Sequence, residues 1–536
     1  MAEIQKHNEK DQPRSEAGSI KATYVEEDVG ADSELHRSLT SRHLTMIGIG
    51  SSIGMGLWLG SGKGLATGGP AALFLGFCVA SSIVWAVTQS IGEMAVMYPL
   101  PSSFVRWTNK FVHPAAGFAL GWCYWFNYWI AVANELQGVV TVLSYWTTAV
   151  PKAALISIFW FLVILTNVWD VRVFGEVEVV MSCIKFGWIF VVVIASIVIS
   201  AGGAPNDEAV GFRYWNETPF INGVVGFLNV LPVCVFALSG SETTGMVAAE
   251  TSNPRKYVPR AFNAIWYRLA MFYLLGSLMV TITVSPTNPA LFGSAHSAAT
   301  QASPFVIAFS GAKLKPLAHM MNAVILLSVF SSASINIFGG ARTLYGLGQI
   351  GTAPKVMTKA DSWGRPWYGL IPTMLLGGAL SYLNVSHTGA QVFGWLSSLV
   401  ALLTMFGWGM ICFSHIRMRH AWKVQGRSPA DLPWRSFAWP WSAYWGLGWC
   451  IFMICVQFYL ALRPIGGGPT VTGFLSSYSS VVAIIVIFLG AKIYYRGPWL
   501  LDASKIDLDS DRRWYSTEEE QVREEKSAIR KLWARI

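Results

Sequence analysis

The sequence predicts an all-α integral membrane protein with twelve transmembrane helices, of which the first and the sixth are discontinuous. Of its 536 residues, 53% are hydrophobic and only 13% are charged, whereas a soluble domain carries roughly 25% charged residues. Apolar runs long enough to cross a bilayer recur along the whole chain. Glycine, serine and threonine interrupt two of these runs, so we expect helices that break inside the membrane.

The apolar runs divide the chain into a membrane domain and two tails. Residues 1–42 are polar and carry mixed charge, which predicts a cytosolic, disordered N-terminal tail. Residues 43–495 form the membrane domain, and residues 496–536 form a cytosolic C-terminal tail. The expected spans are 43–66, 71–98, 117–146, 153–170, 175–201, 220–249, 262–285, 317–342, 369–385, 390–414, 441–462 and 472–495.

The distribution of basic residues predicts the orientation. Twelve spans place both tails on one side of the membrane. With the tails in the cytosol, the inner loops carry more lysine and arginine than the outer loops, as the positive-inside rule requires. Topology therefore explains the net charge of +9, and we expect no nucleic-acid partner. The seven cysteines lie in apolar segments without metal-ligand spacing, so we expect no metal site.

Two apolar runs are interrupted at corresponding positions. The first is IGIGSSIGMGLWLGSG, Ile47 to Gly62, and the second, five spans later, is VFALSGSETTGM, Val235 to Met246. Paired interruptions of this kind point to the binding site of a transporter. An unwound turn frees N–H groups, which suit a carboxylate, and C=O groups, which suit an ammonium. An α-amino acid carries both. The alternative is that the glycines only allow close helix packing.

Three ionisable side chains lie deep within expected spans: Glu135 in the third, Lys185 in the fifth, and Glu242 just after the break in the sixth. A charge there costs roughly 2.5–3.5 kcal/mol on insertion scales and is a functional hypothesis by default. The structural alternatives are a charged tether for Lys185 and helix-bridging hydrogen bonds for the glutamates. Expected gate or interface residues are Glu93, Glu176 and Glu178, and candidate pocket residues are Asn127, Asn134, Ser331, Ser332, Ser334 and Asn336.

Long motifs between Ser38 and Gly497 carry a family resemblance. They include IGIGSSIGMGLWLGSGKGLATGGPA, GEMAVMYPLPSSF and FALSGSETTGMVAAETSNPRKYVPRA. Together they resemble the fungal amino acid permeases, the yeast amino acid transporter family of the amino acid–polyamine–organocation superfamily. The resemblance implies an amino acid permease domain with a five-plus-five inverted repeat and two extra helices. It also implies a plasma-membrane location, proton-coupled import, and no cofactor beyond the coupling proton.

The resemblance also implies roles for particular residues. The backbone of the first break would hold the substrate carboxylate: Ser52, Ile53, Gly54, Met55 and Gly56. The second break would hold the amino group and form part of a gate: Phe236, Ala237, Leu238, Ser239, Gly240 and Ser241. Lys185 matches a lysine that bridges to the first span in proton-coupled relatives. Together with the two glutamates deep within expected spans, this gives Lys185, Glu242 and Glu135 as the expected proton-coupling residues. The chain departs from the family at Met55, Trp58 and Leu238, where relatives commonly carry threonine, phenylalanine and an aromatic residue.

The expected function is secondary active import of amino acids by alternating access, with broad neutral amino acids favoured. One alternative is a non-transporting amino acid sensor on the same fold. Another is a permease narrow for basic, acidic, proline or γ-aminobutyrate substrates. We expect no enzymatic activity, because the chain carries neither a metalloprotease nor a dinucleotide-binding motif. The expected partners are the substrate, the lipid bilayer and, by resemblance, ubiquitin-ligase or endocytic machinery acting on tail lysines such as Lys6, Lys10 and Lys21.

Overall fold

The structure is a computed structural model that describes most of the membrane domain. The described residues are 53–100, 102–169, 171–206, 208–243, 265–291, 302–386 and 389–513, with Met46, Gly50, Val258 and Phe262. The expected N-terminal tail and its lysines lie outside them. Residue contacts divide the chain into two units, Val29–Arg512 and a unit made of the two ends of the chain. All the helices described below lie in the unit Val29–Arg512.

The described residues form helices, with isolated bridges but no strand among them. In chain order the helices are η1 (Gly56–Gly60), α2 (Ser61–Gly68), α3 (Pro70–Met97), α4 (Ser103–Phe111), α5 (Pro114–Leu143), α6 (Lys152–Val168), α7 (Val171–Ser200), α8 (Arg213–Glu217), α9 (Gly223–Leu238), η3 (Leu269–Leu275), α12 (Gly276–Thr283), α13 (Pro304–Gly311), α14 (Lys315–Ile350), η4 (Lys355–Thr358), α15 (Trp367–Ser381), α16 (Leu383–Ser386), α17 (Gly389–Val424), η5 (Pro429–Asp431), α18 (Trp441–Leu462) and α19 (Val471–Tyr495).

Seven of the described helices are long and apolar enough to cross a membrane. They are Pro70–Met97, Val171–Ser200, Ile265–Thr283, Lys315–Ile350, Gln391–Val424, Trp441–Leu462 and Val471–Tyr495. The helices α6 and α9 are apolar but shorter. Among the described residues, the predicted helical architecture with several apolar helices of membrane-spanning length is therefore present.

Two expected spans end too early. The ranges 317–342 and 390–414 stop where the hydropathy falls, but α14 continues to Ile350 and α17 to Val424. The added turns contain polar and basic side chains. Backbone hydrogen bonding continues through such residues, because a helix needs an apolar face only where it meets lipid or core.

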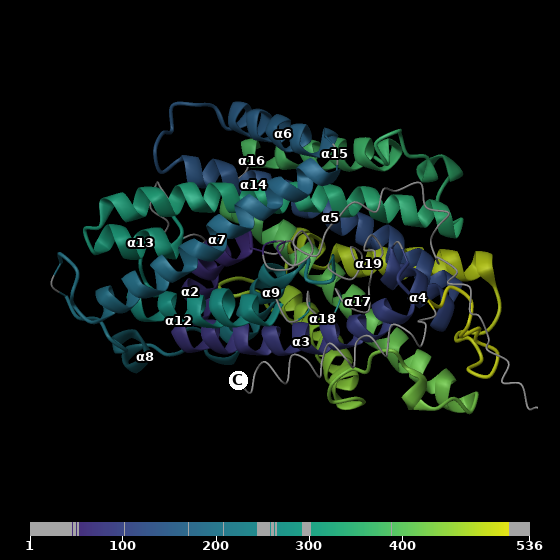
Figure 1. Cartoon of the computed structure of the whole chain (residues 1–536). Helices are drawn as coiled ribbons and strands as arrows, with labels where there is room; N and C mark the ends of the chain where they lie inside the picture. Colours follow the sequence, from purple (N-terminus) through teal and green to yellow (C-terminus); the bar gives the residue numbers. More distant parts are fainter. Residues whose placement is uncertain are drawn as a thin grey trace, which may run out of the picture. The chain divides into compact units, whose positions relative to one another are not determined.

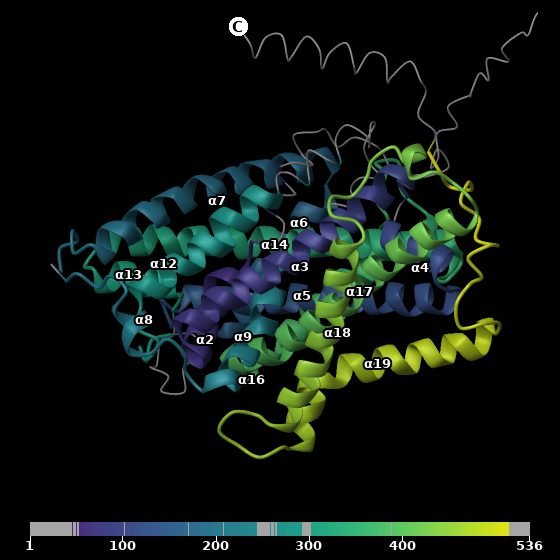
Figure 2. The ribbon, with the colours of Figure 1, turned by 90° about the horizontal axis from the view of Figure 1, so that it is seen from below.

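The helices pack around α5. This helix contacts α14, α15 and α17, while α2 and α3 pack against α9 (Figures 1 and 2). A sharp turn joins α2 to α3, made by Gly69 at φ 87° and by Pro70 at the first position of α3. On α19, apolar side chains such as Ile485, Val486 and Ile493 are exposed, as a lipid-facing helix requires.

The first part of the expected C-terminal tail packs against the membrane domain. We call residues 498–512 the C-terminal strap. The Tyr98 hydroxyl donates to the Leu508 carbonyl at 2.7 Å, and Gln425 Nε2 donates to the Ile506 carbonyl at 2.7 Å. Both strap residues are buried. The strap therefore extends the folded domain beyond residue 496.

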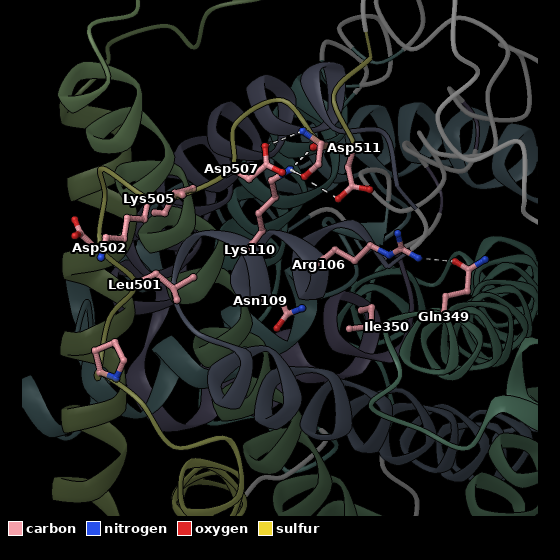
Figure 3. Close-up of a pocket in the computed structure, with 13 residues that line it drawn as sticks. Arg106, Asn109, Lys110, Gln349, Ile350, Leu501, Asp502, Lys505, Asp507 and Asp511 are labelled. Atoms are coloured by element: carbon pink, nitrogen blue, oxygen red, sulfur yellow. Dashed lines mark hydrogen bonds and ion pairs between the residues drawn. The ribbon is translucent and has the colours of Figure 1, made fainter.

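A cavity of about 620 Å³ lies between the strap, α4 and the C-terminal end of α14 (Figure 3). The Lys110 ammonium binds Ser510 Oγ at 2.9 Å and lies 3.7 Å from the Asp511 carboxylate. Arg106 donates to Gln349 Oε1 at 2.8 Å. Charges of both signs line this cavity, and most of them already have partners, so it gives no indication of a ligand class.

Exchanging the charges of Arg427 and Asp509 tests how the strap is held. The Arg427 guanidinium donates to both carboxylate oxygens, at 2.6 and 2.5 Å, and this bonding lowers the pKa of Asp509. A carboxylate with a lowered pKa stabilises the folded state fully above its ordinary pKa of about 3.9. The stabilisation by Asp509 should therefore be lost as the pH falls below that value. We expect Asp509→Arg to speed protease cleavage within the strap, and the double variant Arg427→Asp, Asp509→Arg to slow it again. The pair should contribute about 0.5 kcal/mol, as exposed pairs do. Equal cleavage rates in the single and double variants would contradict this role.

Candidate functional site

The first expected break is present in the structure. The backbone is helical at Gly50, leaves the helix at Ile53 and Gly54, and resumes at Met55. The next turn, η1, has the wider π-helical form, which often occurs at functional sites. Ser52, expected in the same stretch, lies outside the described residues.

The second expected break is also present, and it meets the first. The helix α9 ends at Leu238, Gly240 takes a φ of 85°, and helical backbone begins again at Thr243. A Cβ added to Gly56 would lie 2.5 Å from the Ala237 Cα. The backbones of the two broken helices therefore touch, and only glycine permits this approach.

A carboxylate of the protein itself binds the N-terminus of the resumed first helix. The Met55 N–H donates to Glu135 Oε2 at 3.0 Å, and Ser332 Oγ donates to Glu135 Oε1 at 3.0 Å. A Cβ on Gly54 would lie 2.4 Å from Oε1, so glycine makes room for the carboxylate. Free N–H groups and partial positive charge make a helix N-terminus suitable for an anion. The donor expected to hold a substrate carboxylate thus holds Glu135 in this structure.

The Lys185 ammonium reaches the first broken helix from the opposite side of the break. Its Nζ donates to the Gly50 carbonyl at 2.9 Å and to Ser331 Oγ at 2.9 Å, and the side chain is fully buried. Carbonyl groups just before a break lose their intrahelical hydrogen-bond donors. The Gly50 carbonyl instead accepts hydrogen bonds from the Lys185 ammonium and, across a turn, from the Ile53 N–H. The expected link between Lys185 and the first span is present, while a role in proton coupling stays a prediction.

Glu242 belongs to a separate cluster beyond the second break. Its carboxylate accepts hydrogen bonds from the Tyr124 hydroxyl, from Trp408 Nε1 at 2.8 Å and from the Gly240 N–H at 3.1 Å. These donors come from α5, from α17 and from the break itself. The contacts hold the second break against two long helices, as the structural alternative for Glu242 requires. Its role in proton coupling stays a prediction.

Two side chains that the sequence did not single out also hold the second break. The Tyr273 hydroxyl donates to the Ala237 carbonyl at 2.8 Å, and Arg268 Nη2 donates to Ser241 Oγ at 2.5 Å. Both are buried within the segment Ile265–Thr283. A tyrosine or arginine in an apolar run does not reveal which helix it faces, so only the packing identifies these partners.

The residues that depart from the family pattern are packed inside the domain. Met55 is fully buried, and Gln137 Nε2 donates to its sulfur at 3.3 Å. A Cβ on Gly138 would lie 2.7 Å from that sulfur, so this glycine leaves room for methionine. Leu238 is buried as well. The Met55 side chain therefore fills space against α5, where a threonine would present a hydroxyl.

Five of the six expected pocket residues make hydrogen bonds within the protein. Asn127 Nδ2 donates to Thr404 Oγ1 at 3.3 Å, Asn167 Nδ2 donates to Ser334 Oγ at 2.9 Å, and Asn336 Nδ2 donates to the Ser332 carbonyl at 2.9 Å. Ser331 and Ser332 bind Lys185 and Glu135, as described above. Asn134, next to Glu135 in the chain, is fully buried, and neither atom of its amide has a hydrogen-bond partner among the described residues. Buried polar groups are nearly always paired. A polar ligand bound here would therefore find an unused donor and an unused acceptor.

Comparison with known proteins identifies the family to which this geometry belongs. The family model described as Amino acid permease matches residues 43–501. The chain belongs to the amino acid permease family. This is a family of membrane-embedded, multi-pass transporters, so the chain is an amino acid transporter.

Several relatives of this permease cover nearly its whole length. Amino-acid permease inda1 of Hypocrea atroviridis is 36% identical over 94% of this chain and 89% of that protein. General amino-acid permease GAP2 of Candida albicans and Cationic amino acid transporter 1 of Schizosaccharomyces pombe are each 36% identical over 94% of this chain and 86% of theirs. Among solved structures, a manganese transporter of Eremococcus coleocola aligns with a TM-score of 0.49 and 15% identity, covering 85% of this chain and 93% of that one.

The expected gate or interface residues of the permease lie in different environments. Glu178 of α7 is buried and accepts a hydrogen bond from Ser331 Oγ at 2.6 Å. Glu176 lies on the exposed face of the same helix. Glu93 of α3 is buried and pairs with Arg419 Nε at 2.5 Å. Glu178 is thus the acidic residue of this set that adjoins the Lys185 network.

Proposed function

We propose that this permease is a secondary active transporter that imports amino acids across the plasma membrane by proton symport with alternating access. The proposal includes twelve membrane-spanning helices, arranged as a five-plus-five inverted repeat with two extra helices, and both tails in the cytosol. Broad neutral amino acids are the favoured substrates. The family match and the long apolar helices support this proposal.

The contact between the two broken helices is the observation that carries the proposal. The breaks occur in the first and sixth expected spans, and Gly56 meets Ala237 where they adjoin. The N–H groups at the first break and the carbonyls at the second suit the two groups that every α-amino acid shares. Binding would replace the hydrogen bond that the Met55 N–H makes to Glu135. It would also replace the hydrogen bond that the Ala237 carbonyl accepts from Tyr273. On α5, next to Glu135 in the chain, the Asn134 amide adds a donor and an acceptor that find no partner among the described residues.

Proton coupling is supported by two ionisable groups that hold the first broken helix directly. Lys185 binds the Gly50 carbonyl before the break, and Glu135 binds the Met55 N–H after it. A proton on Glu135 would turn a pure acceptor into a group that also donates, and would weaken its hold on that N–H. A substrate carboxylate would then take this donor. Proton binding and substrate binding would favour each other, as symport requires.

Broad neutral specificity is proposed because the acidic groups near the breaks are already engaged. Both oxygens of Glu135 accept hydrogen bonds from the protein, and Glu242 accepts three. A basic substrate side chain would have to displace one of these bonds. The names of equally similar relatives include both a general permease and a cationic transporter, so they do not decide between the two specificities.

Uptake into liposomes tests the proposal. The purified full-length permease is reconstituted and offered a panel of labelled amino acids under an inward proton gradient of about 2 pH units. With one proton per substrate, we expect neutral amino acids to accumulate up to about a hundredfold. A protonophore should abolish the accumulation, and protein-free liposomes are the control. Binding without movement of any amino acid would contradict transport and favour a sensor.

A further inference from the structure

We propose that Ser331 and Glu178 form the inward exit for the coupling proton, which passes from Lys185 through the Ser331 hydroxyl to the Glu178 carboxylate. This inference deepens the proton symport proposed above and rests on it. It assigns a function to a buried carboxylate that neither broken helix uses. Lys185 and Glu178 lie on α7, and Ser331 lies on α14.

The three side chains form one continuous hydrogen-bonded chain. Lys185 Nζ donates to Ser331 Oγ at 2.9 Å, and Ser331 Oγ donates to Glu178 Oε2 at 2.6 Å. All three are buried, with at most 1% of each side chain exposed. Glu178 precedes Lys185 by about two helical turns, so both side chains lie on the same face of α7, roughly 10 Å apart along the helix axis.

A simple structural ion pair explains this arrangement less well. A buried pair gains most when its charged groups meet directly and have good hydrogen-bond geometry. Here the Ser331 hydroxyl is inserted between Lys185 and Glu178. A hydroxyl can accept one proton while it gives up another, as a relay requires. Besides Glu178, the charged groups close enough to interact electrostatically with Lys185 are Glu135 and Arg268.

The transfer is balanced in protons and in charge. The O–H bond of Ser331 breaks as its proton moves to Glu178 Oε2, and a new O–H bond forms with a proton from Lys185 Nζ. The lysine becomes a neutral amine, the glutamate becomes a neutral acid, and the serine is regenerated. A neutral amine holds the Gly50 carbonyl more weakly than an ammonium does. Proton loss therefore loosens the first broken helix.

An aromatic pair lies about one helical turn before Glu178, towards the start of α7. Phe174, one turn earlier on α7, stacks on Phe338 of α14 with ring centroids 4.4 Å apart and planes 4° apart. The Arg342 guanidinium lies 3.3 Å from the centroid of the Phe338 ring. These three residues also line a small cavity of about 20 Å³ near the start of α7, which the proposed orientation places on the cytosolic side. Separation of α7 and α14 at this pair would release a proton held on Glu178.

The variant Glu178→Gln distinguishes this inference from the proposed function. Purified full-length protein in liposomes is assayed for counterflow at equal pH, which needs no net proton release, and for accumulation under a proton gradient, which does. We expect Glu178→Gln to keep counterflow within about twofold of wild type, while its accumulation falls from about a hundredfold to about onefold. Glu217→Gln, the same chemical change on the exposed short helix α8, should keep both activities.

Ser331 provides a second test of the same route. Ser331→Ala should also lose accumulation and keep counterflow, whereas Ser331→Thr should keep both because it retains the hydroxyl. Accumulation by Glu178→Gln equal to that of wild type would overturn the inference and leave the symport intact. If Glu178→Gln loses counterflow as well, Ser331→Ala decides: loss of accumulation alone supports the route, and unchanged accumulation overturns it. Failure of wild type to accumulate would instead overturn the proposed function.

Discussion

Lys185→Ala is expected to abolish proton-driven uptake of amino acids. The substitution removes the two 2.9 Å bonds from the ammonium to the Gly50 carbonyl and to Ser331 Oγ. It also leaves the buried Glu178 carboxylate without the cation at the other end of its hydrogen-bonded chain. Removing one partner of a buried charge pair costs roughly 3–5 kcal/mol, so uptake should fall by about a hundredfold or more. The measurement is the initial rate of uptake in cells that lack their own permeases, divided by the amount of the protein at the cell surface.

Lys185→Arg distinguishes a proton carrier from a charged tether. An arginine side chain stays protonated in proteins, so it keeps the charge and the donors but cannot release a proton. A carrier at this position predicts that counterflow is retained and accumulation is lost, whereas a tether predicts that both are retained. Lys355→Ala, at an exposed lysine of η4, is the matched control. Normal uptake by Lys185→Ala would contradict both roles.

The helices and their interruptions could be predicted from the sequence because the bilayer constrains the chain locally. Backbone groups must be satisfied in an apolar solvent, so glycine and serine within an apolar run are informative. Both breaks occur within the stretches that these residues mark, at Ile53–Gly54 and after Leu238. The helices α18 and α19 begin within one residue of the expected ranges. The C-terminal ends of α14 and α17 were missed, because hydropathy reports contact with lipid rather than helical hydrogen bonding.

The partners of the buried charges could not be predicted, because they depend on the packing of helices that are distant in sequence. Glu135 binds the N–H of Met55, 80 residues earlier in the chain, and the hydroxyl of Ser332, 197 residues later. The adjacent Ser331 accepts a hydrogen bond from Lys185 instead. Neighbouring residues on a helix point about 100° apart, so two consecutive serines can hydrogen-bond to two different charged side chains. Nothing in the local sequence indicates which serine faces which charge.

Gly56→Ala is expected to reduce transport strongly, because it adds one methyl group where the broken helices meet. The new Cβ would lie 2.5 Å from the Ala237 Cα and 2.9 Å from the Ala237 nitrogen. Backbone atoms cannot rotate aside as a side-chain end can, so one of the two helices must move. Overpacking of this kind typically costs about 1–3 kcal/mol, and we expect uptake per molecule to fall by about tenfold or more. The assay again divides the initial uptake rate by the amount of protein at the cell surface.

Two other glycines provide graded controls and decide between the two explanations of the glycine-rich stretch. A Cβ on Gly64 would lie 2.8 Å from Leu73 Cδ1, the end of a flexible side chain, and a Cβ on Gly187 would meet nothing within 4 Å. The same alanine substitution should therefore reduce uptake slightly at Gly64 and leave it unchanged at Gly187. If Gly56 only allows close packing, Gly56→Ala should lower the amount of folded protein and leave transport per molecule intact. If the contact forms the substrate site, protein should still reach the surface, and transport per molecule should fall because the N–H and C=O groups of the two breaks no longer face one ligand.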